Sequence, residues 1–195
     1  MMVRALRVAL RIALRVALVS FGLSIAASAA EIGGVKLDDK VTVGGQELVL
    51  NGAGVRTKVV FKIYVASLYL PQKSGDLQGV LAKAPRRIQL NMLRALSADQ
   101  LTEALVDGLN EANTPEQLAA IKTQIDQMVS IMKAFKEVKE KDVVTLDYVN
   151  AATQVVWNGE NKGSIAGEAF NQALSRVWLG DKPVQGDLRK AMLGG

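Results

Sequence analysis

The sequence predicts an α+β protein in which helices cover one face of an antiparallel sheet. The segments follow the order of three strands, a helix, a strand, two helices, three strands and a closing helical region, and tight-turn residues join neighbouring strands. A chain of 195 residues that is 49% hydrophobic can bury one sizeable core. No internal repeat or long linker divides it, so we expect a single domain over residues 31–195.

The first 30 residues have the pattern of a secretory signal peptide. They contain four arginines, no acidic residue, an apolar run over residues 16–27 and the small residues Ser28-Ala29-Ala30. The apolar run is shorter than the ~20 residues that span a bilayer. We therefore expect cleavage after Ala29 or Ala30 and a periplasmic protein. A mitochondrial transit peptide and a retained membrane anchor are the alternatives.

Composition excludes several classes of function. The chain has no Cys and no His, which excludes disulfides, thiolate nucleophiles, Ser-His catalysis and nearly every zinc or copper site. Its formal net charge is +5, but four of the basic residues lie in the predicted leader, so the rest is nearly neutral. Nucleic-acid binding needs a basic surface. We expect no metal, no cofactor and no nucleic-acid partner.

Residues 31–70 are predicted to form β-strands. The alternating segments GVKL, KVTV and QELVL are separated by Asp38-Asp39 and Gly44-Gly45, which favour tight turns. The segment NGAGVRTKVVFKIYVASLYL follows at residues 51–70. Its paired glycines, Gly52 and Gly54, indicate a tight turn or a close backbone approach. We expect this turn to place Arg56 at the entrance of a long apolar strand that is buried on both faces or spans the middle of a sheet.

The middle of the chain predicts two helices. Ser97 and Gln100 have the spacing of a capping box ahead of a helix that ends near residue 110. Pro115 stands at the first position of the next helix, whose apolar spacing continues to residue 135 and predicts the longest helix of the chain. On it, Met128, Met132 and Phe135 are either plain core or the lining of a ligand cavity.

The remaining elements are assigned from the spacing of apolar residues. They are a short helix over 76–84, strands over 87–93, 142–149, 153–157 and 162–165, and helices over 168–179 and 185–192. Asn158-Gly159 predicts a hairpin turn between the last two strands.

Arg56 is the main candidate for ligand binding. Its planar guanidinium suits a carboxylate or an enolate-like oxygen, and the alternative is a turn arginine in solvent. Tyr64 and Tyr69 follow on the predicted strand. Their odd separation places them on opposite faces, so only one of them can share a pocket with Arg56.

Over residues 31–193 the chain resembles the chalcone isomerase-like family, particularly its exported bacterial branch. The resemblance is carried by GAGVR at 52–56, FKIYVASLYL at 61–70, the helix after Ser97, GEAFNQALSRVWLGDKPV at 167–184 and DLRKAML at 187–193. It implies an open-faced β-sandwich, in which a large antiparallel sheet is covered on one face by helices and the ligand cleft lies between them.

The resemblance also implies which residues line the cleft. In true chalcone isomerases an arginine in the GAGxR segment polarises the substrate, and four polar side chains assist it. Arg56 matches the arginine. The assisting positions fall on Tyr64, Leu101, Gly108 and Val177, and among these only the tyrosine has a side-chain donor.

The loss of these donors favours a binding protein. The family's non-catalytic members are similar to fatty-acid-binding proteins, and this implies an exported protein that holds a fatty acid or a similar amphipathic carboxylate. The expected ligand-binding residues are Arg56, Tyr64, Tyr69, Leu101, Leu105, Gly108 and Val177, and no catalytic residue is assigned. The alternatives are an isomerase or intramolecular lyase of chalcone isomerase type on an unknown substrate, and an envelope interaction protein without a small ligand. Association with the cell envelope is a further expectation for an exported protein.

Overall fold

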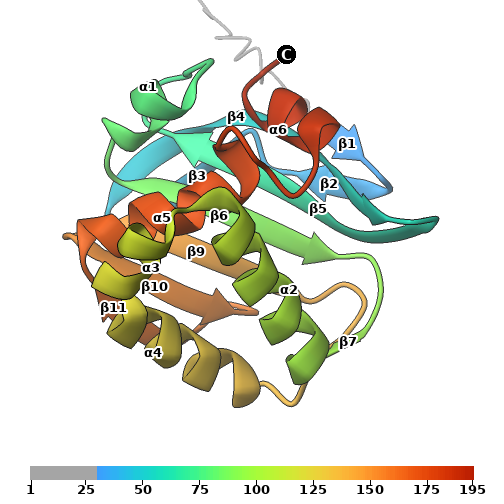
Figure 1. Ribbon diagram of the computed structural model, residues 1–195. Helices are drawn as coiled ribbons and strands as arrows, with labels where there is room; N and C mark the ends of the chain where they lie inside the picture. Colours follow the sequence, from blue (N-terminus) through green and yellow to red (C-terminus); the bar gives the residue numbers. More distant parts are fainter. Residues whose placement is uncertain (1–29) are drawn as a thin grey trace, which may run out of the picture.

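The computed structural model describes residues 30–195, and a seven-stranded antiparallel sheet is its centre (Figure 1). The strand order is β11-β10-β9-β6-β5-β4-β3. In chain order these strands are β3 (Lys40–Val43), β4 (Gln46–Lys58), β5 (Phe61–Leu70), β6 (Arg86–Met92), β9 (Val143–Val149), β10 (Ala152–Trp157) and β11 (Glu160–Ala166). Except for Ala30, the predicted leader lies outside the described residues.

The helices cover one face of this sheet, which we call the inner face (Figure 1). They are α1 (Leu77–Leu81), α2 (Ala98–Ala112), α3 (Pro115–Ala120), α4 (Lys122–Lys133), α5 (Glu168–Leu179) and α6 (Gly186–Met192). Strand residues such as Leu68 and Leu90 pack there against helix residues such as Leu109 and Leu174. This arrangement confirms the predicted α+β fold.

A small two-stranded sheet packs on part of the other face, which we call the outer face. It consists of β1 (Ala30–Ile32) and β2 (Val35–Leu37), and Leu37 packs there with Ala53 of β4 and Val65 of β5. Alternate residues of β5 therefore enter two different cores. This confirms that the central strand is buried on both faces.

The predicted turn at the paired glycines is wrong. Gly52 and Gly54 lie inside the long strand β4, and the chain turns only at Val59-Val60. A Cβ on Gly52 would collide with the carbonyl oxygen of Ala191. The glycines therefore allow α6 to lie directly on the strand, which is the close backbone approach that was the other expectation.

The helix predicted from residue 115 to 135 is two helices. It breaks at Ile121, which leaves the helical conformation with φ −120° and ψ 16° and is buried. No residue of α3 is buried, whereas α4 buries Met128 and Met132. The break lets α4 take its own direction onto the core, and α2, with 15 residues, is the longest described helix.

Several local signals formed as predicted. The Ser97–Gln100 capping box is made in both directions, and Asn158 and Gly159 both have positive φ in the β10–β11 turn. The short strands β7 (Leu96–Ser97) and β8 (Glu137–Val138) were not predicted, because two residues carry no periodicity. No helix within residues 30–195 is long and apolar enough to cross a membrane.

Candidate functional site

Arg56 reaches the inner face because β4 contains a bulge. The pairing of β4 with β5 shifts between Leu50 and Gly52, which leaves Asn51 as an extra residue. One extra residue reverses the face to which all later side chains of a strand point. Leu50, before the bulge, packs on the outer face, whereas Arg56, after it, lines the space under the helices.

Buried Asn51 holds this bulge in place. Its Nδ2 donates to the carbonyl oxygens of Met192 at 2.8 Å and of Ser74 at 3.0 Å, and its Oδ1 accepts from the Ser74 N–H at 2.7 Å. These bonds tie β4 to the end of α6 and to the loop after β5. The bulge is therefore fixed by parts of the chain that are distant in sequence.

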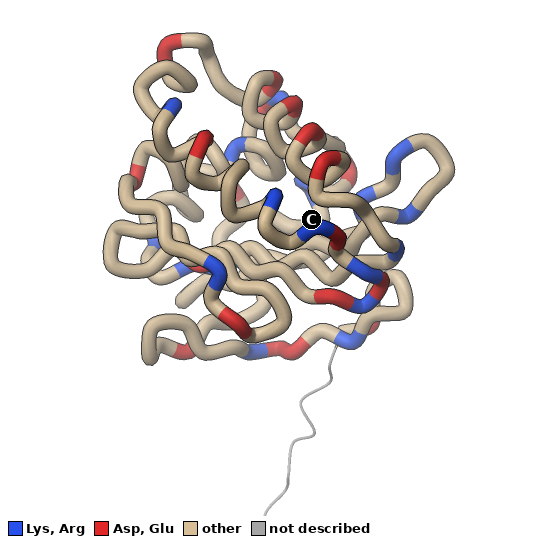
Figure 2. The backbone as a smooth tube through the Cα atoms, turned by 90° about the horizontal axis from the view of Figure 1, so that it is seen from below, with Lys and Arg blue, Asp and Glu red and all other residues tan. Residues whose placement is uncertain are grey.

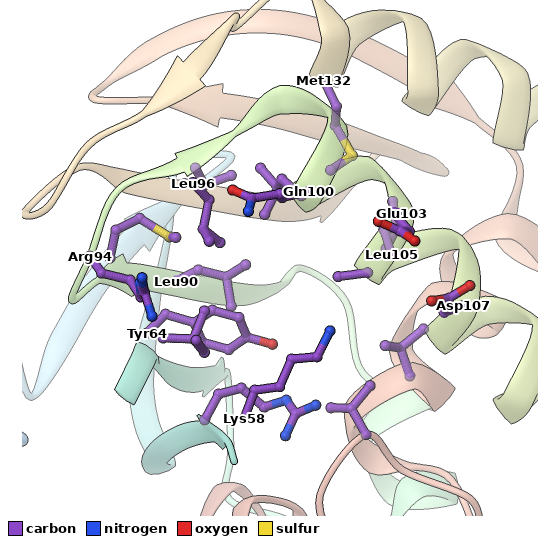
Figure 3. A pocket seen from close by; sticks show the side chains of 18 of the residues that line it. Lys58, Tyr64, Leu90, Arg94, Leu96, Gln100, Glu103, Leu105, Asp107 and Met132 are labelled. Carbon is purple, nitrogen blue, oxygen red and sulfur yellow. The ribbon is translucent and has the colours of Figure 1, made fainter. Parts of the chain in front are cut away.

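A cavity of about 440 Å³ lies between the inner face and the helices α2, α4 and α5 (Figure 3). This volume is in the range of small-molecule binding sites. Its deep part is lined by the side chains of Leu90, Met92, Leu101, Leu105, Met128, Met132, Phe135, Val144, Leu146, Val155 and Val177. Met128, Met132 and Phe135 were predicted to be either plain core or cavity lining. They are both, because they are buried from solvent and their side chains line this cavity.

The mouth of the cavity is polar. The polar side chains on its lining are Arg56, Lys58, Tyr64, Arg94, Gln100, Glu103, Asp107 and Trp178. The cations come from β4 and from the segment after β6, and the two carboxylates come from α2 across the opening (Figure 3). The cavity therefore joins an apolar interior to a charged entrance.

Arg56 and Tyr64 are directly opposite each other on β4 and β5. The Nη1 of Arg56 donates to the carbonyl oxygen of Thr57 at 2.6 Å and to Oε1 of Gln185 at 3.2 Å. Among residues 30–195, no carboxylate forms an ion pair with Arg56. Its remaining N–H groups can therefore donate to an anion in the cavity mouth.

Gln185, the residue before α6, positions this end of β4. Its Oε1 also accepts from the Thr57 N–H at 2.9 Å, and its Nε2 donates to the carbonyl oxygen of Val55 at 3.2 Å. One amide side chain thus contacts three consecutive residues of the strand that carries Arg56. Sequence reasoning missed Gln185, because no local pattern indicates a contact over this distance.

Tyr64 is held by a tryptophan from α5. The Nε1 of Trp178 donates to the hydroxyl oxygen of Tyr64 at 3.0 Å, which leaves the phenol O–H free to donate to another group. Burial raises the pKa of Tyr64, although the Trp178 hydrogen bond and the charge of Arg56 act in the opposite direction. The phenol is therefore a neutral donor at neutral pH. A buried tryptophan needs a partner for its N–H, and this was the signal for Trp178 that sequence reasoning did not use.

The structure brings most of the predicted site residues together. Those that line the cavity are Arg56, Tyr64, Leu101, Leu105 and Val177.

Two predicted site residues lie elsewhere. Tyr69 is on the outer face, where it packs with Leu48, because an odd separation on β5 turns it away from Tyr64. Gly108 is a contact between helices, since a Cβ there would lie 2.8 Å from Cγ1 of Val177. The prediction that Tyr69 and Gly108 bind the ligand is therefore wrong. No cluster of acidic residues within residues 30–195 could hold a metal ion.

Known proteins share the fold of this chain. The family model described as chalcone isomerase-like matches residues 29–194. No curated protein sequence matches the chain. Among solved structures, the Arabidopsis thaliana fatty-acid binding protein AtFAP1 superposes with a TM-score of 0.64 at 13% identity, covering 82% of this chain and 92% of that one. At this identity the likeness shows a shared fold.

Proposed function

Because the chain belongs to the chalcone isomerase-like family, we propose that it is a binding protein for a fatty acid or a similar amphipathic carboxylate. The observation that carries the proposal is Arg56, a cation without a carboxylate partner among the described residues, at the mouth of an apolar cavity of about 440 Å³. The similarity in fold to a protein named for fatty-acid binding supports it.

The polar end of the cavity suits a carboxylate. A carboxylate that leaves water must be paired, and Arg56 with the Tyr64 hydroxyl offers charge-assisted and neutral donors side by side. The bonds of Nη1 to Thr57 and Gln185 hold the guanidinium in place before a ligand arrives. Less side-chain entropy is then lost on binding.

The apolar end suits an alkyl chain. Each methylene that leaves water contributes about 0.8 kcal/mol. Met92, Met128 and Met132 line this region, and their unbranched thioether side chains adapt to flexible apolar ligands.

The residues at the positions of the assisting polar side chains of true chalcone isomerases favour binding over isomerisation. Leu101 and Val177 line the cavity without any side-chain donor, and Gly108 is used for helix packing. Losing a single transition-state donor typically costs about 100-fold in rate. We expect turnover of a hydroxychalcone to be negligible. Spectrophotometric turnover close to that of a true isomerase, and dependent on Arg56, would support the isomerase instead.

We also propose that the protein is exported to the periplasm and loses its first 29 or 30 residues. The proposal rests on the leader pattern in the sequence. N-terminal sequencing of protein recovered from the envelope tests it, and an intact Met1 in the exported pool would contradict cleavage.

The decisive experiment for ligand binding is calorimetric titration with a long-chain fatty acid. Arg56→Ala should weaken binding by about 2–5 kcal/mol, the usual cost of truncating one partner of a buried charge pair. Arg56→Lys should restore only part of it, because an ammonium lacks the planar fork.

The matched control is Lys73→Ala, which removes an exposed cation from the loop after β5 and should not change the affinity. Equal affinities for Arg56→Ala and the parent protein would refute the carboxylate-binding role.

A further inference from the structure

The tip of the β4–β5 hairpin exposes large apolar side chains to solvent. Val59 is 89% exposed, Val60 77% and Phe61 56%, and these are the large hydrophobic residues that stand out as exposed within residues 30–195. Scattered exposed apolar residues are ordinary, but three consecutive ones at one tip form a small patch.

This hairpin projects beyond the rest of the sheet. On one side β3 pairs with β4 only as far as Val49, and on the other β6 pairs with β5 only as far as Tyr64. Gln185 holds Thr57 and the Leu93 N–H donates to the Ile63 carbonyl oxygen, so residues 58–62 are the part that extends outward as an arm, at the right of Figures 1 and 2. The exposed patch is therefore convex and stands at the end of an arm.

The turn residues are poor choices for the turn itself. Val59 has φ 58°, a conformation that β-branched residues rarely adopt, and two-residue hairpin turns favour Gly, Asn or Asp at such a position. Strained backbone is found preferentially where function requires a particular side chain. An apolar side chain at this position thus fits a role at the tip better than a role in folding.

Basic residues surround the patch. Lys58 and Lys62 flank the turn, and the guanidinium of Arg94 lies 4.6 Å from the centre of the Phe61 ring. No acidic residue occurs between residues 48 and 75. In Figure 2 this arm carries the blue of basic residues and no red of acidic ones. The nearest carboxylates on the cavity lining, those of Glu103 and Asp107, belong to α2 across the opening.

We propose that this tip inserts into the surface of an anionic lipid bilayer. Apolar side chains ringed by Lys and Arg combine burial at the acyl boundary with attraction to anionic headgroups. A stable protein interface buries about 800 Å² on each partner, far more than three side chains at a convex tip can offer. The bilayer is therefore the partner that the shape and charge of the tip fit.

Insertion would bring the cavity to the membrane. Lys58, Val59 and Phe61 belong both to the tip and to the cavity lining, and Arg56 lies two residues before Lys58. An amphipathic ligand could then pass between bilayer and cavity without crossing water. Membrane docking goes beyond ligand binding, and each can hold without the other.

A single fluorescent label tests the contact directly. The chain has no cysteine, so Val60→Cys provides one attachment site for an environment-sensitive dye. The control is Gln72→Cys, an exposed position just past the opposite end of β5. All proteins are used as recovered from the expressing cells and share one N-terminus.

Phosphatidylcholine vesicles with phosphatidylglycerol should shift the emission of the label at residue 60 to the blue and leave the label at residue 72 unchanged. Vesicles of phosphatidylcholine alone should have little effect on either. A label at residue 60 that does not respond to the anionic vesicles overturns the proposal.

Two substitutions outside the cavity lining measure the strength of docking by vesicle sedimentation. Val60→Asp should weaken vesicle binding by tenfold or more, and Lys62→Gln by about fivefold, as expected for one cation near an anionic surface. Titration with a fatty acid in the absence of vesicles should be the same for both variants and the parent. A parent protein that does not bind the fatty acid would refute the ligand-binding proposal without affecting the vesicle result. The two proposals are therefore tested separately.

Unchanged vesicle binding in Val60→Asp overturns the bilayer as partner. If that variant instead changes the molecular mass measured by light scattering, the tip contacts a second copy of the chain and the proposal is likewise wrong.

Discussion

Two helices that cover the same sheet pack in opposite ways. Under α6 the strand carries Gly52 and Gly54, so the helix backbone lies against β4 with no room for a side chain. Under α2 the strands carry Leu90 and Met92, and a cavity of about 440 Å³ remains. The helix α2 packs closely against its neighbours α4 and α5 instead.

The difference shows how one core combines rigidity and space. The tight side holds Arg56 in position, because Gln185 at the start of α6 accepts a hydrogen bond from Arg56 and the end of α6 accepts one from Asn51. The open side provides volume and adaptable side chains. Added bulk should therefore damage folding on the α6 side and damage only binding on the α2 side.

The largest effect is expected on the tight side. Gly52→Val should lower the free energy of unfolding by about 3 kcal/mol, because its Cβ collides with the backbone of α6. Urea denaturation measures the change. Gly75→Val is the control, since no atom lies within 4 Å of the added Cβ, and it should cost about 0.5 kcal/mol or less. Equal costs for the two variants would contradict the tight packing of α6.

On the open side, added bulk should have a different result. Leu101→Trp fills part of the cavity, so the free energy of unfolding should change by less than about 1 kcal/mol. Fatty-acid affinity should fall about tenfold, which corresponds to about 1.4 kcal/mol. Parallel denaturation and calorimetry measure both quantities. Strong destabilisation with unchanged affinity would show that this side is packed as tightly as the other.

Tyr64 lies at the boundary between the tight side and the open side. Tyr64→Phe removes a hydroxyl that can donate to the ligand. The same hydroxyl accepts from the Trp178 N–H, so that hydrogen bond is lost as well. The affinity for a fatty acid should fall by about 1 kcal/mol. Calorimetric titration measures it, and a loss as large as that of Arg56→Ala would place the main anion contact on the tyrosine.

The smallest effect is expected on the pH dependence of stability, at the residues that support Phe135 on the cavity lining, which we call the cavity floor. The ring of Trp157 packs against that of Phe135 at a tilt of 34°, with ring centroids 4.9 Å apart, and its Nε1 donates to Asp142 at 3.0 Å. Partial burial acts to raise the pKa of Asp142, but hydrogen bonds from the Lys139 N–H, Asn158 and Trp157 lower it overall.

A lowered folded-state pKa stabilises the fold above the unfolded value of about 4, and this contribution is lost as the pH falls through the folded value. The thermal midpoint of the parent should therefore fall more between pH 5 and the acid range, about pH 3, than that of Asp142→Asn. Parallel slopes for the two proteins would show that the carboxylate does not support the floor.

Local patterns carried much of the architecture. The capping box at Ser97 and the turn at Asn158-Gly159 are made by residues close in sequence, so the sequence alone predicts them. The alternating apolar residues of β5 similarly predict a strand that enters two cores. The same spacing correctly separated Tyr64 from Tyr69.

Long-range contacts decided the rest. The break at Ile121 cannot be read from helical spacing, because the apolar period continues through it. Trp178 and Gln185 reach their partners in β4 and β5 across more than half of the chain. Such contacts have no signature in either local sequence.

The α+β fold and the place of Arg56 near the central strand follow from the amino-acid sequence, since strand and helix periods are properties of neighbouring residues. The face that Arg56 occupies depends on contacts between distant parts of the chain. That choice depends on one extra residue, Asn51, whose bulge is held by hydrogen bonds to Ser74 and to Met192 at the other end of the domain. Without the bulge the side-chain alternation of β4 would direct Arg56 to the outer face, away from the cavity.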